Sequence, residues 1–155
     1  MNPSRAAWLS PAMTTKPTAP ATVEVTERNF DALLAASAAG GILLIDFWAA
    51  WCGPCRAFAP VFEAAAARHP DLVFGKVDTE AERGLAAAFR VSAIPTLAVM
   101  RDGILLTAQP GAQPPAALDA LIAKVRALDM DEVRREIAAQ QAAAPQGRAA
   151  AAATR

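Results

Sequence analysis

Hydrophobic residues follow strand-like and helix-like spacings in alternation from residue 22 onward. The stretch Thr22-Val23-Glu24-Val25-Thr26 alternates between polar and apolar positions, which predicts a short strand. The runs 42–48 and 72–77 are apolar at successive positions, as in central strands that helices cover on both faces. Apolar residues three and four apart predict helices over 27–39, 53–69, 79–89 and 115–128.

The helix starts and the last strands have their own local signals. Thr26 is expected to cap the first helix, and Asp78 or Thr79 the third. Arg101-Asp102-Gly103 predicts a hairpin turn between strands over 96–100 and 104–108. The element order is then βαβαβαββα, whose first part favours right-handed crossovers between parallel strands. We predict an α/β fold with a mixed five-stranded sheet flanked by helices.

One domain over 21–128 accounts for this pattern, and shorter segments lie on either side of it. Residues 1–20 are rich in Pro, Thr and Ala and are expected to be a disordered leader in which Trp8 is unstructured and Met13 is an alternative start. An extra helix is predicted over 129–141, and residues 142–155 read as an alanine-rich disordered tail. The pattern suggests no role for either C-terminal piece.

Charge and hydropathy exclude several classes of function. Lys plus Arg and Asp plus Glu are equal at 15 each, so nothing predicts binding to nucleic acid or an anionic membrane. No apolar run is long enough to span a bilayer, and residues 1–20 lack the apolar core of a secretory signal. We therefore expect a cytoplasmic location. The chain is also expected to be a monomer.

Both cysteines lie in Trp51-Cys52-Gly53-Pro54-Cys55, at a strand-to-helix junction. A structural disulfide here would close a very short loop and constrain the unfolded chain little. A zinc site needs about four ligands, whereas this chain has two cysteines and one histidine, so no metal is expected. Reversible dithiol–disulfide exchange is the remaining interpretation. His69, at the end of the second helix, is interpreted as a surface or capping residue.

The two cysteines differ in their expected roles. Cys52 lies at the amino end of a helix, where unpaired backbone amides stabilise a thiolate, so it is the expected nucleophile. Cys55 lies one turn later and is the expected resolving thiol. Asp46 stands in an otherwise apolar strand, where burial would raise its pKa and suit it to accept a proton. The alternative for Asp46 is a solvated strand end.

These motifs resemble the thioredoxin family. Asp46-Phe47-Trp48-Ala49 followed by residues 51–55 is similar to its active-site signature, and Ile94-Pro95-Thr96 is similar to its cis-proline loop. The resemblance covers about residues 21–128 and implies the thioredoxin fold. Within the family, residues 56–60 and 76–83 look most like the bacterial thioredoxin 2 subgroup. That subgroup usually carries an amino-terminal zinc module, but residues 1–20 hold no cysteine, so zinc binding is not carried over.

The resemblance also implies a role for each matching residue. Gly53 and Pro54 would tune the pair towards reduction, and Lys76 would neighbour Asp46, the alternative being an exposed lysine. A cis bond at Pro95, rather than an ordinary trans turn, would free the Ile94 backbone to pair with an extended client. The residues expected around Cys52 as an apolar rim are Trp51, Pro54, Ile94 and Gly111, with Trp48 packed behind the loop.

The expected function is therefore a cytoplasmic protein-disulfide reductase that cycles Cys52 and Cys55 and binds no cofactor. The resemblance implies disulfide-containing client proteins and an NADPH-dependent flavoprotein, thioredoxin reductase, as partners. Two alternatives remain open. One is an adaptor or chaperone that holds partners on the apolar rim, and the other is a dedicated reductant whose single client engages residues 129–155.

Overall fold

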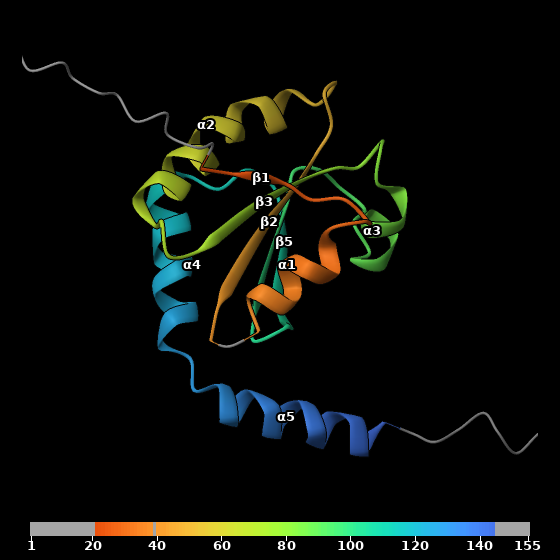
Figure 1. Ribbon diagram of the computed structural model, residues 1–155, viewed down its shortest axis with the longest axis vertical. Helices are drawn as coiled ribbons and strands as arrows, with labels where there is room; N and C mark the ends of the chain where they lie inside the picture. The colour runs from red at the N-terminus through yellow and green to blue at the C-terminus, as the bar shows by residue number, and fades with distance from the viewer. Residues whose placement is uncertain (1–20, 39, 145–155) are drawn as a thin grey trace, which may run out of the picture.

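The computed structural model describes residues 21–38 and 40–144, which form a central sheet covered by helices on both faces (Figure 1). The predictions for 1–20 and for most of the tail lie outside these residues. The elements are, in chain order, β1 (Val23–Glu24), α1 (Phe30–Ala36), β2 (Ile42–Trp48), α2 (Gly53–Arg68), β3 (Val73–Asp78), α3 (Arg83–Ala88), β4 (Thr96–Arg101), β5 (Ile104–Pro110), α4 (Pro115–Ala127) and α5 (Met130–Ala143).

The five strands lie in the order β1-β3-β2-β4-β5. β3 is parallel to both β1 and β2, whereas β4 is antiparallel to β2 and β5. Asp102 and Gly103 form the hairpin turn, and their φ values of 53° and 75° are those that a tight two-residue turn requires. The predicted mixed five-stranded sheet with flanking helices is therefore confirmed.

The two faces of β2 belong to different cores. Leu43, Ile45 and Phe47 pack on the side of α1 and α3. Ile42 and Leu44 pack on the other side, against α2 and α4. Because side chains alternate along a strand, Asp46 lies on the α2 face, two residues beyond Leu44. The sheet thus directs Asp46 towards the helix that carries the cysteines.

Two helices begin later than predicted, because side chains close turns ahead of them. Thr26 Oγ1 accepts from the Asn29 N–H at 3.3 Å, and Asn29 Oδ1 accepts from the Thr26 N–H at 2.8 Å. This turn delays α1 to Phe30, so Thr26 is not its N-cap. Asp78 Oδ1 likewise accepts from the N–H groups of residues 80 and 81, and α3 begins at Arg83 rather than at 79.

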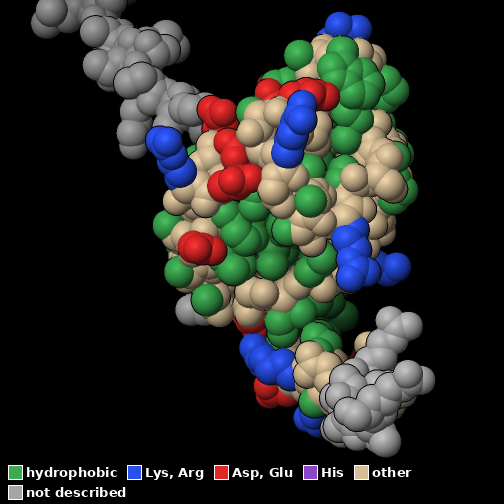
Figure 2. Space-filling view, turned by 90° about the vertical axis from the view of Figure 1, so that its right-hand side faces the viewer, with side chains coloured by type: hydrophobic (Ala, Val, Ile, Leu, Met, Phe, Trp, Pro, Cys, Tyr) green, Lys and Arg blue, Asp and Glu red, His purple; other side chains and the backbone are tan. Residues whose placement is uncertain are grey.

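The predicted extra helix forms as α5, and it leaves the body at the end of the sheet opposite the cysteines (Figure 1). Asp129 caps it by accepting from the N–H groups of Asp131 and Glu132. Met130 is its one buried residue. Positive and negative side chains gather where α5 meets the body (Figure 2). Among the helices described, none is long and apolar enough to cross a membrane.

Candidate active site

The cysteine pair lies where β2 passes into α2. Cys52 is the N-cap of α2, with extended backbone angles, and its Sγ accepts from the Cys55 N–H at 3.2 Å. Cys52 and Cys55 form a disulfide with a Cα–Cα distance of 5.3 Å. The first-turn amides of α2 have no partners within the helix, so they favour negative charge on Cys52 once the pair is reduced. Pro54 lies in this first turn, where a missing amide hydrogen costs nothing.

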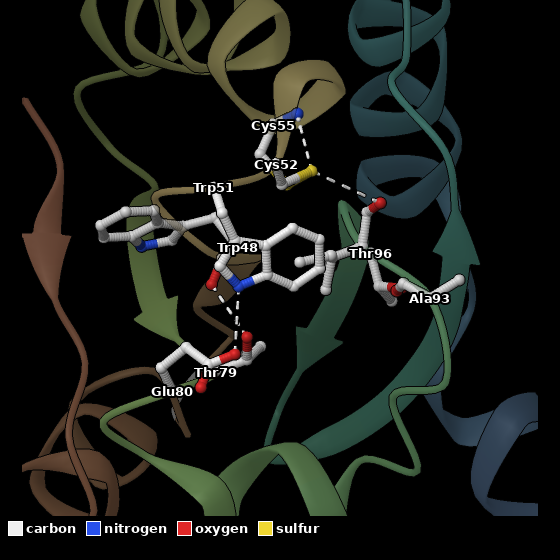
Figure 3. Close-up of a disulfide and its surroundings, with 9 residues drawn as sticks. Trp48, Trp51, Cys52, Cys55, Thr79, Glu80, Ala93 and Thr96 are labelled. Carbon is white, nitrogen blue, oxygen red and sulfur yellow. Dashed lines mark hydrogen bonds between the residues drawn. A yellow bond between two sulfur atoms is a disulfide. The ribbon is translucent and has the colours of Figure 1, made fainter.

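Both cysteines are buried, whereas the residue before them is exposed. Cys52 and Cys55 are 4% and 2% exposed, but Trp51 is 69% exposed. The Trp51 indole N–H donates to Glu80 Oε1 at 3.1 Å, which holds the ring beside the start of α2 (Figure 3). A cavity of about 430 Å³ adjoins this ring, and its lining residues are Trp51, Thr79, Ala86, Val91, Ser92, Ala93 and Ile94.

A loop ahead of β4 approaches Cys52 from the other side (Figure 3). The predicted cis peptide bond is present between Ile94 and Pro95. The Ile94 carbonyl oxygen lies 3.7 Å from Cys52 Sγ. Thr96 is buried and its hydroxyl donates to the Ala93 carbonyl, while the Gly111 N–H donates to the Pro95 carbonyl at 2.8 Å. The structure therefore brings Ile94 and Pro95 to the cysteines, with Gly111 bonded behind them.

Asp46 is fully buried, and neither of its carboxylate oxygens has a hydrogen-bond partner within the described residues. Burial raises the pKa of this carboxyl to about 7, and the positive charge of Lys76 only partly offsets the rise. Asp46 and Cys55 line the same cavity of about 200 Å³, together with Trp48, Arg56, Ala59 and Lys76. The solvated alternative for Asp46 is thereby ruled out.

Lys76 lies beside Asp46 in the sheet, because the two residues are register partners on β3 and β2. Its ammonium group, however, is 3.7 Å from Glu63 Oε1 and 5.3 Å from the centre of the Trp48 ring. Trp48 itself packs against the cluster formed by Ala49, Cys52 and Cys55, as predicted. The lysine is therefore held at the wall of the cavity by groups other than Asp46.

Three neighbours of the site were not predicted: Glu63, Glu80 and Thr96. Glu63 had a signal, because Cys55, Ala59 and Glu63 follow each other at a spacing of four on α2 and so share a face. Thr96 belongs to the Ile94-Pro95-Thr96 motif, which gave it no role of its own, and nothing along the chain pointed to Glu80. His69 is the C-cap of α2, and its ring contacts Asp119 and Arg126 rather than either cysteine. Within residues 21–38 and 40–144, no group of three or more His, Cys, Asp or Glu is placed to hold a metal ion.

Comparison with known proteins identifies close relatives. Residues 21–124 match the family model described as Thioredoxin. A Streptomyces coelicolor protein named "Putative thioredoxin 2" is 56% identical over 123 residues, which cover 79% of this chain and 90% of the relative. A thioredoxin of Bacillus subtilis is 37% identical, with 67% of this chain and 97% of the relative covered. The X-ray structure of Fasciola hepatica thioredoxin matches with a TM-score of 0.62 and 34% identity, covering 66% of this chain and 97% of that one.

Proposed function

The chain belongs to the thioredoxin family and is a thiol–disulfide oxidoreductase with the thioredoxin fold, and on this premise we propose that it reduces disulfide bonds in client proteins. The observation that carries the proposal is the Cys52–Cys55 disulfide, with the Ile94 carbonyl 3.7 Å from Cys52 Sγ. This carbonyl belongs to a backbone segment that an extended client strand can pair with, which would set a client disulfide against Cys52.

The first step is attack by Cys52. Its thiolate, favoured by the amides at the start of α2, attacks one sulfur of the client disulfide. A Cys52–client bond forms and the client disulfide breaks, and the leaving client sulfur departs as a thiolate that takes up a proton. Trp51, Pro54, Ile94 and Gly111 are the residues proposed to contact the client around this mixed disulfide.

The second step is attack by Cys55. Asp46, which shares a cavity with Cys55, accepts the proton of the Cys55 thiol. The Cys55 thiolate then attacks Cys52 Sγ, so the Cys52–Cys55 bond forms and the Cys52–client bond breaks. The second client sulfur leaves as a thiolate. The client has gained two electrons, and the disulfide present in this structure is the product state.

The disulfide itself carries the electrons, so the proposal requires no bound cofactor or metal. Gly53 and Pro54 between the cysteines are proposed to favour the reducing direction. Members of this family generally act on disulfide-containing proteins and are reduced in turn by thioredoxin reductase, and we assign both kinds of partner to this chain. We further propose that it acts as a cytoplasmic monomer and maintains protein thiols in the reduced state.

A second function is favoured by the exposed apolar surface. Trp51 is 69% exposed beside a cavity of about 430 Å³, and this surface would also suit an adaptor or chaperone that holds partners without redox turnover. The two functions differ in their need for Cys52, because binding to the rim would survive its replacement by serine.

The deciding experiment follows NADPH oxidation with a bacterial thioredoxin reductase and insulin as the disulfide substrate. We expect turnover with the wild-type chain and none with Cys52→Ser. Insulin reduction that appears only when dithiothreitol is supplied would retain the chemistry and replace the proposed electron donor. Inactivity in both assays would reject the reductase and favour the adaptor.

A further inference from the structure

The carboxyl group of Asp46 and the ammonium group of Lys76 lie on adjacent strands, yet they do not form the buried ion pair that their register favours. Asp46 and Lys76 are direct register partners on parallel strands. Both line the cavity of about 200 Å³ next to Cys55. The oxygens of Asp46 nevertheless have no hydrogen-bond partner among the described residues. Something else must therefore determine where the lysine ammonium rests.

Two groups contact the Lys76 ammonium group at the cavity wall, namely Glu63 and Trp48. Glu63, on the third turn of α2, places Oε1 3.7 Å from Lys76 Nζ. The Trp48 ring lies under the same nitrogen at 5.3 Å, a distance typical of a cation–π contact. The Lys76 side chain is 22% exposed and that of Glu63 is 56% exposed, so their pairing lies at the solvent side of the cavity. The lysine is thus anchored outward, while Asp46 faces inward.

We propose that Glu63 is a positioning residue that holds the Lys76 ammonium at the mouth of the cavity, and so keeps the Asp46 carboxylate unpaired and able to accept the Cys55 proton. The part of this inference that concerns the Cys55 proton rests on the proposed function, whereas the part that concerns the position of Lys76 does not. If Lys76 were free to turn inward, it would form a salt bridge with Asp46. A carboxylate in such a pair binds a proton less tightly, because the neighbouring positive charge stabilises its ionised form.

The charged and titratable groups around Asp46 are few. Lys76 comes from β3, and Cys55, Arg56 and Glu63 come from α2. On β4, the register partner of Asp46 is Leu97, which carries no charge. Glu24 and Asp78 line a neighbouring cavity with Lys76, but the ion pair of the Lys76 ammonium is with Glu63. The removal of Glu63 has a predictable sign, since both the loss of its negative charge and an inward turn of Lys76 favour ionised Asp46.

The test measures the ionisation of Asp46 directly in the oxidised protein, through the NMR shift of its carboxyl carbon against pH. We expect Glu63→Gln to lower the proton affinity of Asp46 by about threefold, mainly because the freed Lys76 ammonium can turn towards the carboxylate. Lys76→Met should move the midpoint the opposite way. In the Lys76→Met background, Glu63→Gln should then have a clearly smaller effect, because only the direct loss of one partly screened charge remains.

Glu136→Gln is the matched control, because it removes the same charge from an exposed position on α5 at the far end of the sheet. An Asp46 midpoint that is unchanged or raised by Glu63→Gln would overturn the proposal. So would an equal shift in the Lys76→Met background, which would mean that Glu63 acts by its field alone, or an equal shift in Glu136→Gln.

The assay is independent of the proposed reductase activity. If wild type reduces no insulin but the Asp46 midpoint responds as expected, the positioning role stands and the proposed function fails. If the chain is an active reductase, the rate of Cys55 attack should fall at acid pH as Asp46 becomes protonated. Glu63→Gln should shift this fall to lower pH. The rate is followed as the decay of a preformed Cys52–client disulfide.

Discussion

The two ends of the sheet differ in whether their charged groups are hydrogen-bonded. At the end where β2 and β3 finish, Asp46 is buried with no hydrogen-bond partner in the described part of the chain, and Trp51 is 69% exposed. At the other end, Asp102 accepts from the Gly40 N–H at 2.8 Å and from Arg134 at 2.7 Å. Nη1 of Arg101 donates to three carbonyls at the C-terminal end of α4, those of Val125, Arg126 and Leu128. The buried Nε of this guanidinium lacks a partner among the described residues.

This difference places the redox chemistry at one end of the sheet and a stabilising network of hydrogen bonds at the other. Burying the Asp46 carboxyl costs free energy of folding, but the same burial raises its pKa to about 7, so it can exchange a proton near neutral pH. The hydrogen-bonded groups at the other end link the C-terminus of α4 and the first turns of α5 to the hairpin turn between β4 and β5. We therefore expect changes at the cysteine end to alter redox turnover and pH dependence, and changes at the far end to alter stability alone.

The largest expected effect is that of Cys55→Ser. Cys52 can still attack a client disulfide, but no thiol remains to release the client, so turnover of insulin should fall to background. A covalent Cys52–client adduct should accumulate, visible by mass spectrometry and removed by dithiothreitol. Arg134→Gln, at the far end, is the control and should turn over like the wild type. Sustained turnover by Cys55→Ser would show that Cys55 is not the resolving thiol.

Next in size is the effect of Asp46→Asn on stability. The pKa of Asp46 is about 7 in the folded protein against an ordinary 3.8, so folding favours its protonated form and wild type loses stability as pH rises between these values. The variant has no such loss and should be more stable than wild type at about pH 8, by up to about 4 kcal/mol. The difference should vanish near pH 4, as measured by urea unfolding across this range.

Asp119→Asn provides a control of opposite sign. Hydrogen bonds from Arg68 and His69 hold the pKa of Asp119 below its ordinary value, so its ionised form stabilises the fold as pH rises. Its replacement should bring no gain in stability at about pH 8. Equal gains from both variants would mean that lost negative charge, rather than burial of Asp46, explains the result.

Removing the chain after Leu128 should have a smaller effect, confined to stability. The truncation loses the burial of Met130, which is 7% exposed, and the bond from Arg134 to Asp102. We expect the free energy of unfolding to fall by about 2 kcal/mol, with insulin reduction unchanged. Lost activity in the folded truncation would instead favour the dedicated reductant whose client engages residues 129–155.

Arg134→Gln should have the smallest effect, a destabilisation of about 1 kcal/mol or less, because the Arg134 side chain is half exposed. The loss should shrink as salt is added, since ions screen the pair that it removes. Its neighbour Arg135 is exposed, and Arg135→Gln serves as the matched control. Equal losses in both variants would assign the effect to the charge of α5 rather than to the contact with Asp102.

Periodicity along the chain predicted most of the elements, but it missed those boundaries that side chains set. β2 and the order of strands and helices followed from apolar runs and spacing. The start of α1 did not, because Thr26 and Asn29 bond to each other's backbone and form a turn where helical spacing continues. The start of α3 was missed for the same reason at Asp78.

The cysteine motif, its position between strand and helix, and the anomaly of an aspartate in an apolar strand were all visible in the sequence. These are local features, since each depends on residues within a few positions of one another. The approach of Ile94 to Cys52 was expected only from the family resemblance, whereas the pairing of Lys76 with Glu63 was decided only by the tertiary structure. The same holds for the proton affinity of Asp46, because desolvation depends on every element that covers a group, and those elements are distant in the chain.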